Sequence, residues 1–311
     1  MQSLFQKLLT LPGTDTPLKY NGETSNGIWN DGTLTADNAA SEYSVIGGIP
    51  LFMGKGEKQK FPKSFHFLND TKMSSEELIR SNWETMRTDR EIDSLYNDWT
   101  QTILDTNGLI LELSAGPGGG LAPLLLDYDV DVKLLIHGLD YYTLKEIKEI
   151  TDNTGAWENI GFAQFDFCKF PVKSDSFEAV NSFGAVSNMP DTANAFAEIF
   201  RILRPGGRLF LLDMELTPDS FEDLPENARN EMAEFDPNYN INIKSRLAEA
   251  GFGIEYYSLT EERLIQPREN VLADIANHHG IQLSMQTFRL EARKPININF
   301  NSHPFSADSI P

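Results

Sequence analysis

The sequence predicts an α/β protein whose mostly parallel sheet of seven strands carries helices on both faces. From Gly108 onward, short apolar runs alternate with stretches of helical periodicity. The apolar runs are continuous rather than alternating with polar residues, which is typical of parallel strands that are buried on both faces. The expected strands are residues 109–113, 133–139, 160–165, 177–182, 207–213, 253–260 and 282–293. The expected helices lie near residues 119–127, 142–153, 191–203, 243–252 and 268–278.

The remaining segments suggest a domain organisation around this sheet. Residues 1–56 are rich in Gly, Asn, Asp and Thr with short apolar pieces, which predicts a small β-rich unit. Residues 57–107 form a linker and a helical cap, and residues 108–294 form the α/β domain. Within that domain, residues 216–240 are acidic and contain three prolines, so we expect an inserted lid. Residues 295–311 are expected to form a tail.

Composition limits the function and the compartment. A formal net charge of −20 repels phosphate backbones, so nucleic-acid binding is unlikely. No apolar run reaches the roughly 18 residues that a membrane-spanning helix needs. The single cysteine, Cys168, excludes an intrachain disulfide and a four-cysteine zinc site. We therefore expect a cytoplasmic protein without a membrane segment; the oligomeric state stays open.

The first expected strand of the α/β domain runs into a glycine-rich turn, LILELSAGPGGG. The strand delivers Glu112, and the turn continues as Ser114-Ala115-Gly116-Pro117-Gly118. Glycine lets a backbone turn sharply and approach a ligand closely. A dinucleotide-binding turn would have Gly where Leu121 stands, and a carboxylate at the strand end would lie close to a pyrophosphate. The turn therefore favours a ligand that carries a positive charge.

These residues resemble the first motif of the class I S-adenosylmethionine-dependent methyltransferases, an acid followed by three glycines at alternate positions. Here the motif reads Glu112-x-Ser114-x-Gly116-x-Gly118, with Ser in the first glycine slot. The resemblance implies a Rossmann-like fold and S-adenosylmethionine as cofactor. It also implies that the loop, including Ala115, wraps the methionine part and that Glu112 acts near the ammonium group through water.

Further matches follow in the family's order. Asp140, with Tyr141 after it, resembles the acid that binds both ribose hydroxyls, and Asp166-Phe167 resembles the pair that meets the adenine. Each aspartate has an alternative role as the cap of a helix or a turn. The fourth strand and the Pro205-Gly206-Gly207 turn before the fifth also match. The resemblance adds cofactor contacts at Ser182 and Phe183, at the end of the fourth strand.

The residues that would bind the methyl-accepting substrate are less clearly indicated by the sequence. Ser187 and Asn188 follow the fourth strand, where they could orient a substrate or instead cap the helix that begins near Asp191. Tyr96 and Trp99 precede the first motif; they could line the methyl pocket by cation–π attraction or simply pack in the core. The five histidines are scattered or adjacent, so no metal site is expected.

The sequence therefore predicts an S-adenosylmethionine-dependent methyltransferase that acts on a small molecule. One alternative is methylation of a base in ribosomal or transfer RNA, because residues 43–52 resemble the end of a zinc-ribbon-like domain that has lost its cysteines. A second alternative is a non-catalytic, methyltransferase-like binding or regulatory subunit.

Overall fold

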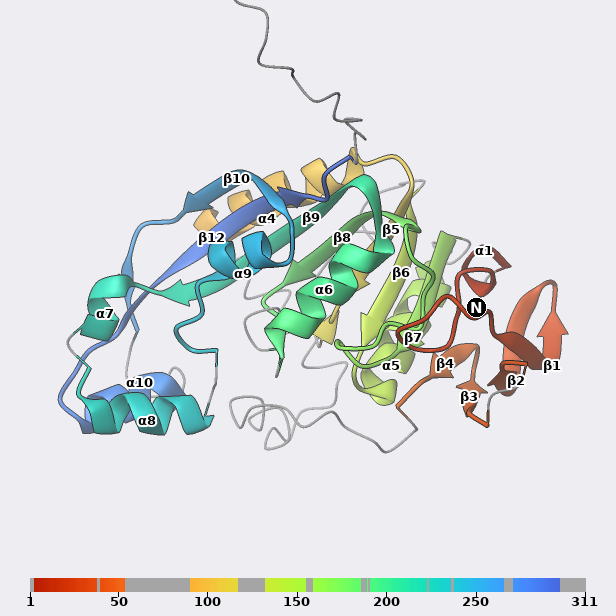
Figure 1. The fold of residues 1–311 in the computed structure, drawn as a ribbon, viewed down its shortest axis with the longest axis horizontal. Coiled ribbons are helices and arrows are strands. Elements are labelled where there is room, and N and C mark those ends of the chain that lie inside the picture. The colour runs from red at the N-terminus through yellow and green to blue at the C-terminus, as the bar shows by residue number, and fades with distance from the viewer. Residues whose placement is uncertain are drawn as a thin grey trace, which may run out of the picture.

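A single twelve-stranded sheet runs through the protein (Figure 1). The computed structural model describes residues 3–37, 40–53, 90–116, 132–154, 159–185, 189, 191–222, 224–235, 238–265 and 271–296. The predicted helix near 119–127, most of the 57–107 linker and nearly all of the tail lie outside these residues. Within them, no helix is both long and apolar enough to cross a membrane.

Seven of the strands form the predicted α/β sheet, in the order β7-β6-β5-β8-β9-β12-β10. The first five of these strands are parallel to their neighbours, whereas β12 is antiparallel to β9 and to β10. A short β11 also pairs with β12. Their bounds are β5 (Leu109–Leu113), β6 (Lys133–Gly138), β7 (Ile160–Gln164), β8 (Phe177–Phe183), β9 (Leu203–Leu216), β10 (Gly253–Leu259), β11 (Arg263–Leu264) and β12 (Ser284–Arg293). The predicted α/β class is confirmed.

The predicted start of the fifth parallel strand at residue 207 was wrong by four residues. Strand β9 begins at Leu203, directly after helix α6 (Thr192–Ile202). The Pro-Gly-Gly sequence makes a tight turn near the start of β9: Gly206 has φ +81°, and a Cβ on Gly207 would lie 2.8 Å from the Arg204 carbonyl oxygen.

Helices cover both faces of the sheet, as predicted. On one face lie α4 (Arg90–Leu104) and α5 (Tyr141–Thr154), which pack Trp99, Ile103 and Leu144 against a cluster that includes Ile110. On the other face lie α6 and α9 (Ile243–Glu249), seen in front of the sheet in Figure 1. Two separate apolar clusters therefore hold the layers together.

The N-terminal unit extends the same sheet. It comprises α1 (Ser3–Gln6), β1 (Lys19–Ser25), β2 (Ile28–Thr35), β3 (Glu42–Ile46) and β4 (Ile49–Leu51). The four strands form an antiparallel meander, and Leu51 of β4 then pairs in parallel with Gln164 of β7. The expected β-rich unit is present, but the sheet is larger than the predicted seven strands because β4 occupies the edge of β7.

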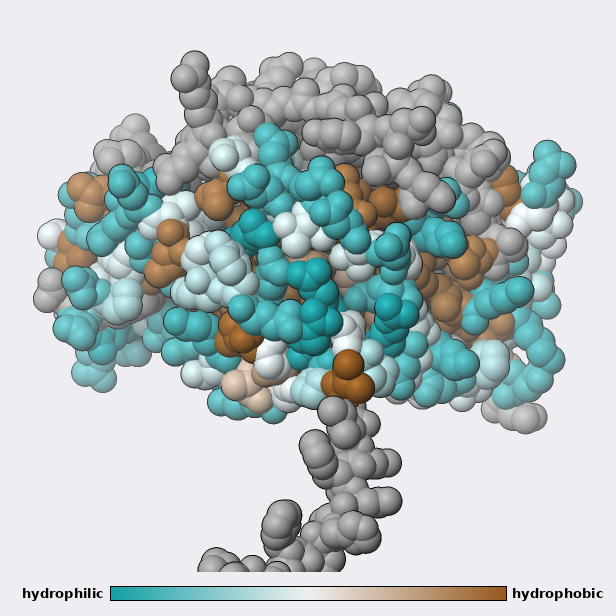
Figure 2. All heavy atoms as spheres, turned by 90° about the horizontal axis from the view of Figure 1, so that it is seen from above, coloured by the Kyte–Doolittle hydropathy of each residue, from teal (hydrophilic) through white to brown (hydrophobic). Residues whose placement is uncertain are grey.

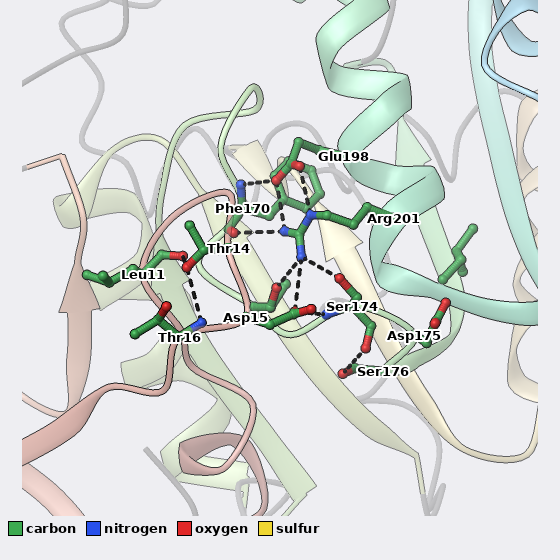
Figure 3. A network of polar contacts seen from close by, with 12 residues as sticks. Leu11, Thr14, Asp15, Thr16, Phe170, Ser174, Asp175, Ser176, Glu198 and Arg201 are labelled. Atoms are coloured by element: carbon green, nitrogen blue, oxygen red, sulfur yellow. Dashed lines mark hydrogen bonds and ion pairs between the residues drawn. The ribbon is translucent and has the colours of Figure 1, made fainter. Parts of the chain in front are cut away.

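A polar network fastens the N-terminal segment to the α/β domain (Figure 3). The Arg201 guanidinium of α6 donates to Glu198 at 2.8 and 2.9 Å and to the Phe170 carbonyl oxygen at 3.0 Å. The Asp15 carboxylate lies 3.7 Å from Arg201 and accepts a hydrogen bond from the Ser174 N–H at 2.7 Å. The Ser174 N–H bond also helps to hold the pKa of Asp15 below its usual value. The network thus joins Asp15, in the N-terminal segment, to Ser174 and Arg201 of the α/β domain.

A third apolar cluster lies beyond the end of β9. It joins α8 (Glu226–Phe235) and α10 (Val271–His278), which lie side by side (Figure 1), to the ends of β9 and β12; the short α7 (Pro218–Glu222) precedes α8 in the chain. Its buried members include Leu224, Met232 and Ala276. The acidic segment 216–240 therefore folds as a small helical layer with residues from near the C-terminus, at the edge where the parallel strands end.

Hydrophilic side chains dominate the face seen from above, and hydrophobic ones are scattered among them (Figure 2). This distribution fits the net charge of −20.

Candidate functional site

The candidate site lies at the carboxyl edge of the parallel strands, where ligands bind in open α/β sheets. Neighbouring parallel strands end at the same edge, so β5, β6, β7 and β8 bring together the loops that follow them. These strand ends carry the described candidates, which are Glu112, Ser114, Ala115, Gly116, Asp140, Tyr141, Asp166, Phe167, Ser182 and Phe183. Gly118, Ser187 and Asn188 lie outside the described residues.

Glu112 is the last residue but one of β5, and only 1% of its surface is exposed. It is paired across the ladders with Ile136 of β6 and Asn181 of β8. Its side chain lies on the same face as that of Ile110, because alternate residues of a strand share a face. The carboxylate therefore points into the layer between the sheet and α4.

Ser114 begins the loop in a left-handed conformation, with φ +61°. Such a conformation is unfavourable for most residues and suits glycine. Its N–H donates to His137 Nδ1 at 3.0 Å, and the next N–H, of Ala115, donates to the His137 carbonyl oxygen at 2.9 Å. Ser114 thus occupies the family's first glycine slot with a backbone conformation that glycine favours.

His137 was not among the predicted site residues. It lies in β6 with no exposed surface, and its Nε2 is 2.9 Å from the Phe165 carbonyl oxygen. Because Nδ1 accepts from Ser114, the ring proton is on Nε2 and is donated to Phe165. Burial lowers the pKa of His137 to about 4, so the ring is neutral near pH 7. Sequence reasoning could have found His137 from one signal, namely a histidine inside an otherwise apolar strand.

Asp140 follows β6 and caps helix α5. Its Oδ2 accepts hydrogen bonds from the N–H and the hydroxyl of Thr143, at 2.8 and 3.0 Å. The preceding residue is fixed as well, because the Gln164 side-chain amide donates to the Leu139 carbonyl oxygen at 3.0 Å. Tyr141 is buried, and burial raises its pKa. The alternative capping role of Asp140 is present, and it leaves other carboxylate lone pairs for a ligand.

Asp166 follows β7 and stabilises a turn, since its Oδ1 accepts from the Cys168 N–H at 2.7 Å. The Phe167 ring is buried and meets the His137 ring edge-on at 5.1 Å. It is therefore the Phe167 backbone that remains for an adenine contact. Burial raises the pKa of Cys168 to about 12, which keeps the thiol protonated.

An aromatic cluster borders the end of β8. Phe183 lies 5.5 Å from Tyr96 and 6.1 Å from Trp99, measured between ring centroids. Trp99 is completely buried and Ser182 almost so. Core packing, one of the two roles considered for Tyr96 and Trp99, is thus present, and the methyl-pocket role stays a prediction.

The loop after β8 leads into a capped helix. Asp191 caps α6 by accepting from the Asn194 N–H at 3.0 Å. The Asn238 side chain, from the segment after α8, donates to the Met189 carbonyl oxygen. The helical layer therefore contacts the chain directly after the predicted substrate residues. In the part of the chain that the structure describes, no group of three His, Cys, Asp or Glu side chains could hold a metal ion.

The family described as "Methyltransferase domain" matches residues 111–211, which run from β5 to β9 and include every strand end described above. Over residues 111–211, the chain is therefore similar to the methyltransferase domain family. A sterol 24-C-methyltransferase of Aspergillus fumigatus is 27% identical over 120 residues, which cover 39% of this chain and 31% of that protein. A ubiquinone/menaquinone biosynthesis C-methyltransferase of Cronobacter sakazakii is 25% identical over 191 residues, 59% of this chain and 72% of that protein.

The fold of the methyltransferase domain has a solved counterpart. The crystal structure of MccD protein superposes with a TM-score of 0.50 at 11% identity, covering 63% of this chain and 96% of that one. At that identity, the likeness concerns the fold alone. This chain spans less than a third of the sterol enzyme and about three quarters of the quinone enzyme.

Proposed function

We propose that this protein transfers a methyl group from S-adenosylmethionine to a small-molecule acceptor. The observation that carries the proposal is the order of side chains along one sheet edge: Glu112 on β5, Asp140 after β6 and Asp166 after β7. Three acidic groups on three adjacent strands suit a ligand with an ammonium group, a ribose diol and an adenine amino group. The match of the methyltransferase family to this segment supports the same assignment.

The residues present fit this cofactor by their donor and acceptor chemistry. A carboxylate has about four acceptor sites, so Asp140 can cap α5 and still accept from both ribose hydroxyls. Asp166 would accept from the adenine amino group, and Ser114 to Gly116 would present backbone to the methionine part. When bound, the cofactor supplies an electrophilic methyl group on a positively charged sulfur.

The protein's contribution to transfer is orientation. A displacement at the methyl carbon needs the acceptor atom and the sulfur in line, and holding them so supplies much of the rate. The half-buried Phe183 ring, which packs on Tyr96 and Trp99, would form part of an apolar wall for the acceptor. The Asn238 side chain would hold Met189, which directly follows Ser187 and Asn188 in the sequence. The names of the sterol and quinone relatives support a small apolar acceptor.

Calorimetric titration with S-adenosylhomocysteine tests the cofactor, with NADH as the control ligand. We expect binding of the first compound only. A second assay tests the acceptor: labelled S-adenosylmethionine is incubated with the protein and with separated small-molecule and RNA fractions. Label in the RNA fraction would favour the RNA alternative, and binding without transfer to either fraction would favour the regulatory subunit.

A further inference from the structure

We propose that His137 is a positioning residue that holds the cofactor loop in its binding conformation by fixing the left-handed backbone of Ser114. The inference rests on the proposed function, because the loop is the one assigned to the methionine part of the cofactor. His137 itself would touch no ligand.

The geometry of the imidazole connects three strands. From β6, its Nδ1 accepts from Ser114 at the end of β5, and its Nε2–H donates to Phe165 at the end of β7. The His137 carbonyl oxygen adds a third bond, from Ala115. Two consecutive loop N–H groups are therefore held by one residue of the neighbouring strand.

The surroundings leave the ring little freedom. The Phe165 ring lies 4.0 Å from the imidazole centroid and the Phe167 ring 5.1 Å, and no part of His137 is exposed. A ring fixed by packing loses little further entropy when it forms its hydrogen bonds. The neutral Nε2–H form fits both partners; a doubly protonated ring would turn a second N–H toward the Ser114 N–H.

This arrangement accounts for the serine in a glycine slot. Glycine adopts a positive φ freely, whereas serine needs compensation from its surroundings. The bond from Ser114 to Nδ1 provides that compensation. His137 and Ser114 together would thus maintain a positive φ that glycine adopts without help. Substitutions at the two positions should therefore be energetically coupled.

Two conservative variants separate the two ends of the imidazole. His137→Asn keeps an acceptor near the position of Nδ1 but loses the donor to Phe165. His137→Gln keeps a donor near the position of Nε2 but loses the acceptor for Ser114. If His137 positions the loop, His137→Gln should weaken S-adenosylhomocysteine binding about tenfold, which is the loss of roughly one hydrogen bond, and His137→Asn should weaken it much less. Equal losses in the two variants would overturn the proposal.

Amide hydrogen exchange supplies a readout that needs no ligand. Protection of the Ser114 N–H should fall in His137→Gln and persist in His137→Asn. Ile136→Val is the matched control, since this buried neighbour on β6 makes no side-chain bond to the loop, and both readouts should stay at wild-type values. If the wild type binds no S-adenosylhomocysteine, the proposed function fails, while unchanged Ser114 protection in His137→Gln refutes the inference itself.

The coupling is tested by adding Ser114→Gly. Glycine should restore most of the affinity that His137→Gln loses, because it does not need the bond to adopt a positive φ. A double variant no better than His137→Gln alone would contradict the pairing. Should His137→Gln fail to fold, the double variant and His137→Asn still allow the comparison.

Discussion

Single side chains at the candidate site have structural partners before any ligand arrives. Asp140 caps α5, Asp166 stabilises a turn and His137 joins three strands. A helix cap is worth about 1 kcal/mol. Loss of function in a variant at these positions must therefore be separated from loss of stability.

Asp140→Ala should lower both cofactor affinity and stability. We expect about a 10- to 100-fold loss in S-adenosylhomocysteine affinity, because hydrogen bonds to a charged group are strong, and a loss of about 1 kcal/mol in the free energy of unfolding. Calorimetry and urea denaturation measure the two effects. Asn242→Ala is the matched control: Asn242 caps α9 by accepting from Ser245 at 3.0 Å, on the opposite face. If both variants bound equally well, Asp140 would be a cap only.

His137 should make stability depend on pH in a defined window. Its pKa is about 4 in the folded protein against about 6.5 when unfolded, so the unfolded chain takes up the proton first. The stabilisation is complete above pH 6.5 and falls as the pH drops toward 4, by on the order of 3 kcal/mol in total. In urea denaturation, the stability advantage of wild type over His137→Asn should shrink from pH 7 to pH 4. A constant difference would contradict the buried neutral state.

At the scale of elements, close packing joins helix α1 to strand β7. A Cβ on Gly161 would lie 2.6 Å from the ring of Phe5, which is fully buried. Gly161→Ala should therefore cost about 1–3 kcal/mol by overpacking. Denaturant titration measures the cost, and Phe5→Leu in the same chain should relieve part of it. If the two changes were additive, the ring would not be what limits the space at Gly161.

The positions of helices and strands were predicted correctly where a local sequence pattern determines the structure. The continuous apolar run of β5 and the capped, periodic α6 were predicted to within about one residue. The start of β9 was missed because Leu203 already pairs with Phe177 of β8, before the tight turn at Gly206 shifts the register to Arg208 opposite Ala179. The pairing of β4 with β7 joins residues more than a hundred positions apart, and no local pattern encodes it.

The same distinction holds at the candidate site. Glu112, Asp140 and Asp166 were located because each directly follows or ends an apolar run. The capping bonds of Asp140 and Asp166 are local, to Thr143 and Cys168, and capping was one of the two roles considered for each aspartate. The bonds of His137, in contrast, depend on how neighbouring strands align, which the sequence does not display. The cofactor roles of these residues and of Gly118 stay predictions, as do the substrate-orienting roles of Ser187 and Asn188.

At the scale of the whole molecule, the N-terminal unit and the methyltransferase domain should unfold together. They share a sheet, an apolar cluster that contains both Trp29 and Phe196, and the Arg201 network. In native-state hydrogen exchange with increasing denaturant, the slowest amides of β2 and β5 should lose protection at the same denaturant concentration. Earlier loss in β2 would show that the N-terminal unit opens independently.

The pairing of β4 with β7 also limits how the protein can be divided. A fragment beginning after residue 53 would keep the segment that matches the methyltransferase family, yet it would bare the β7 edge and the apolar surface that Phe5 covers at Gly161. Bare sheet edges attract other chains. Anyone trimming this protein to a minimal catalytic unit should expect aggregation unless the new edge is blocked by charge or by proline.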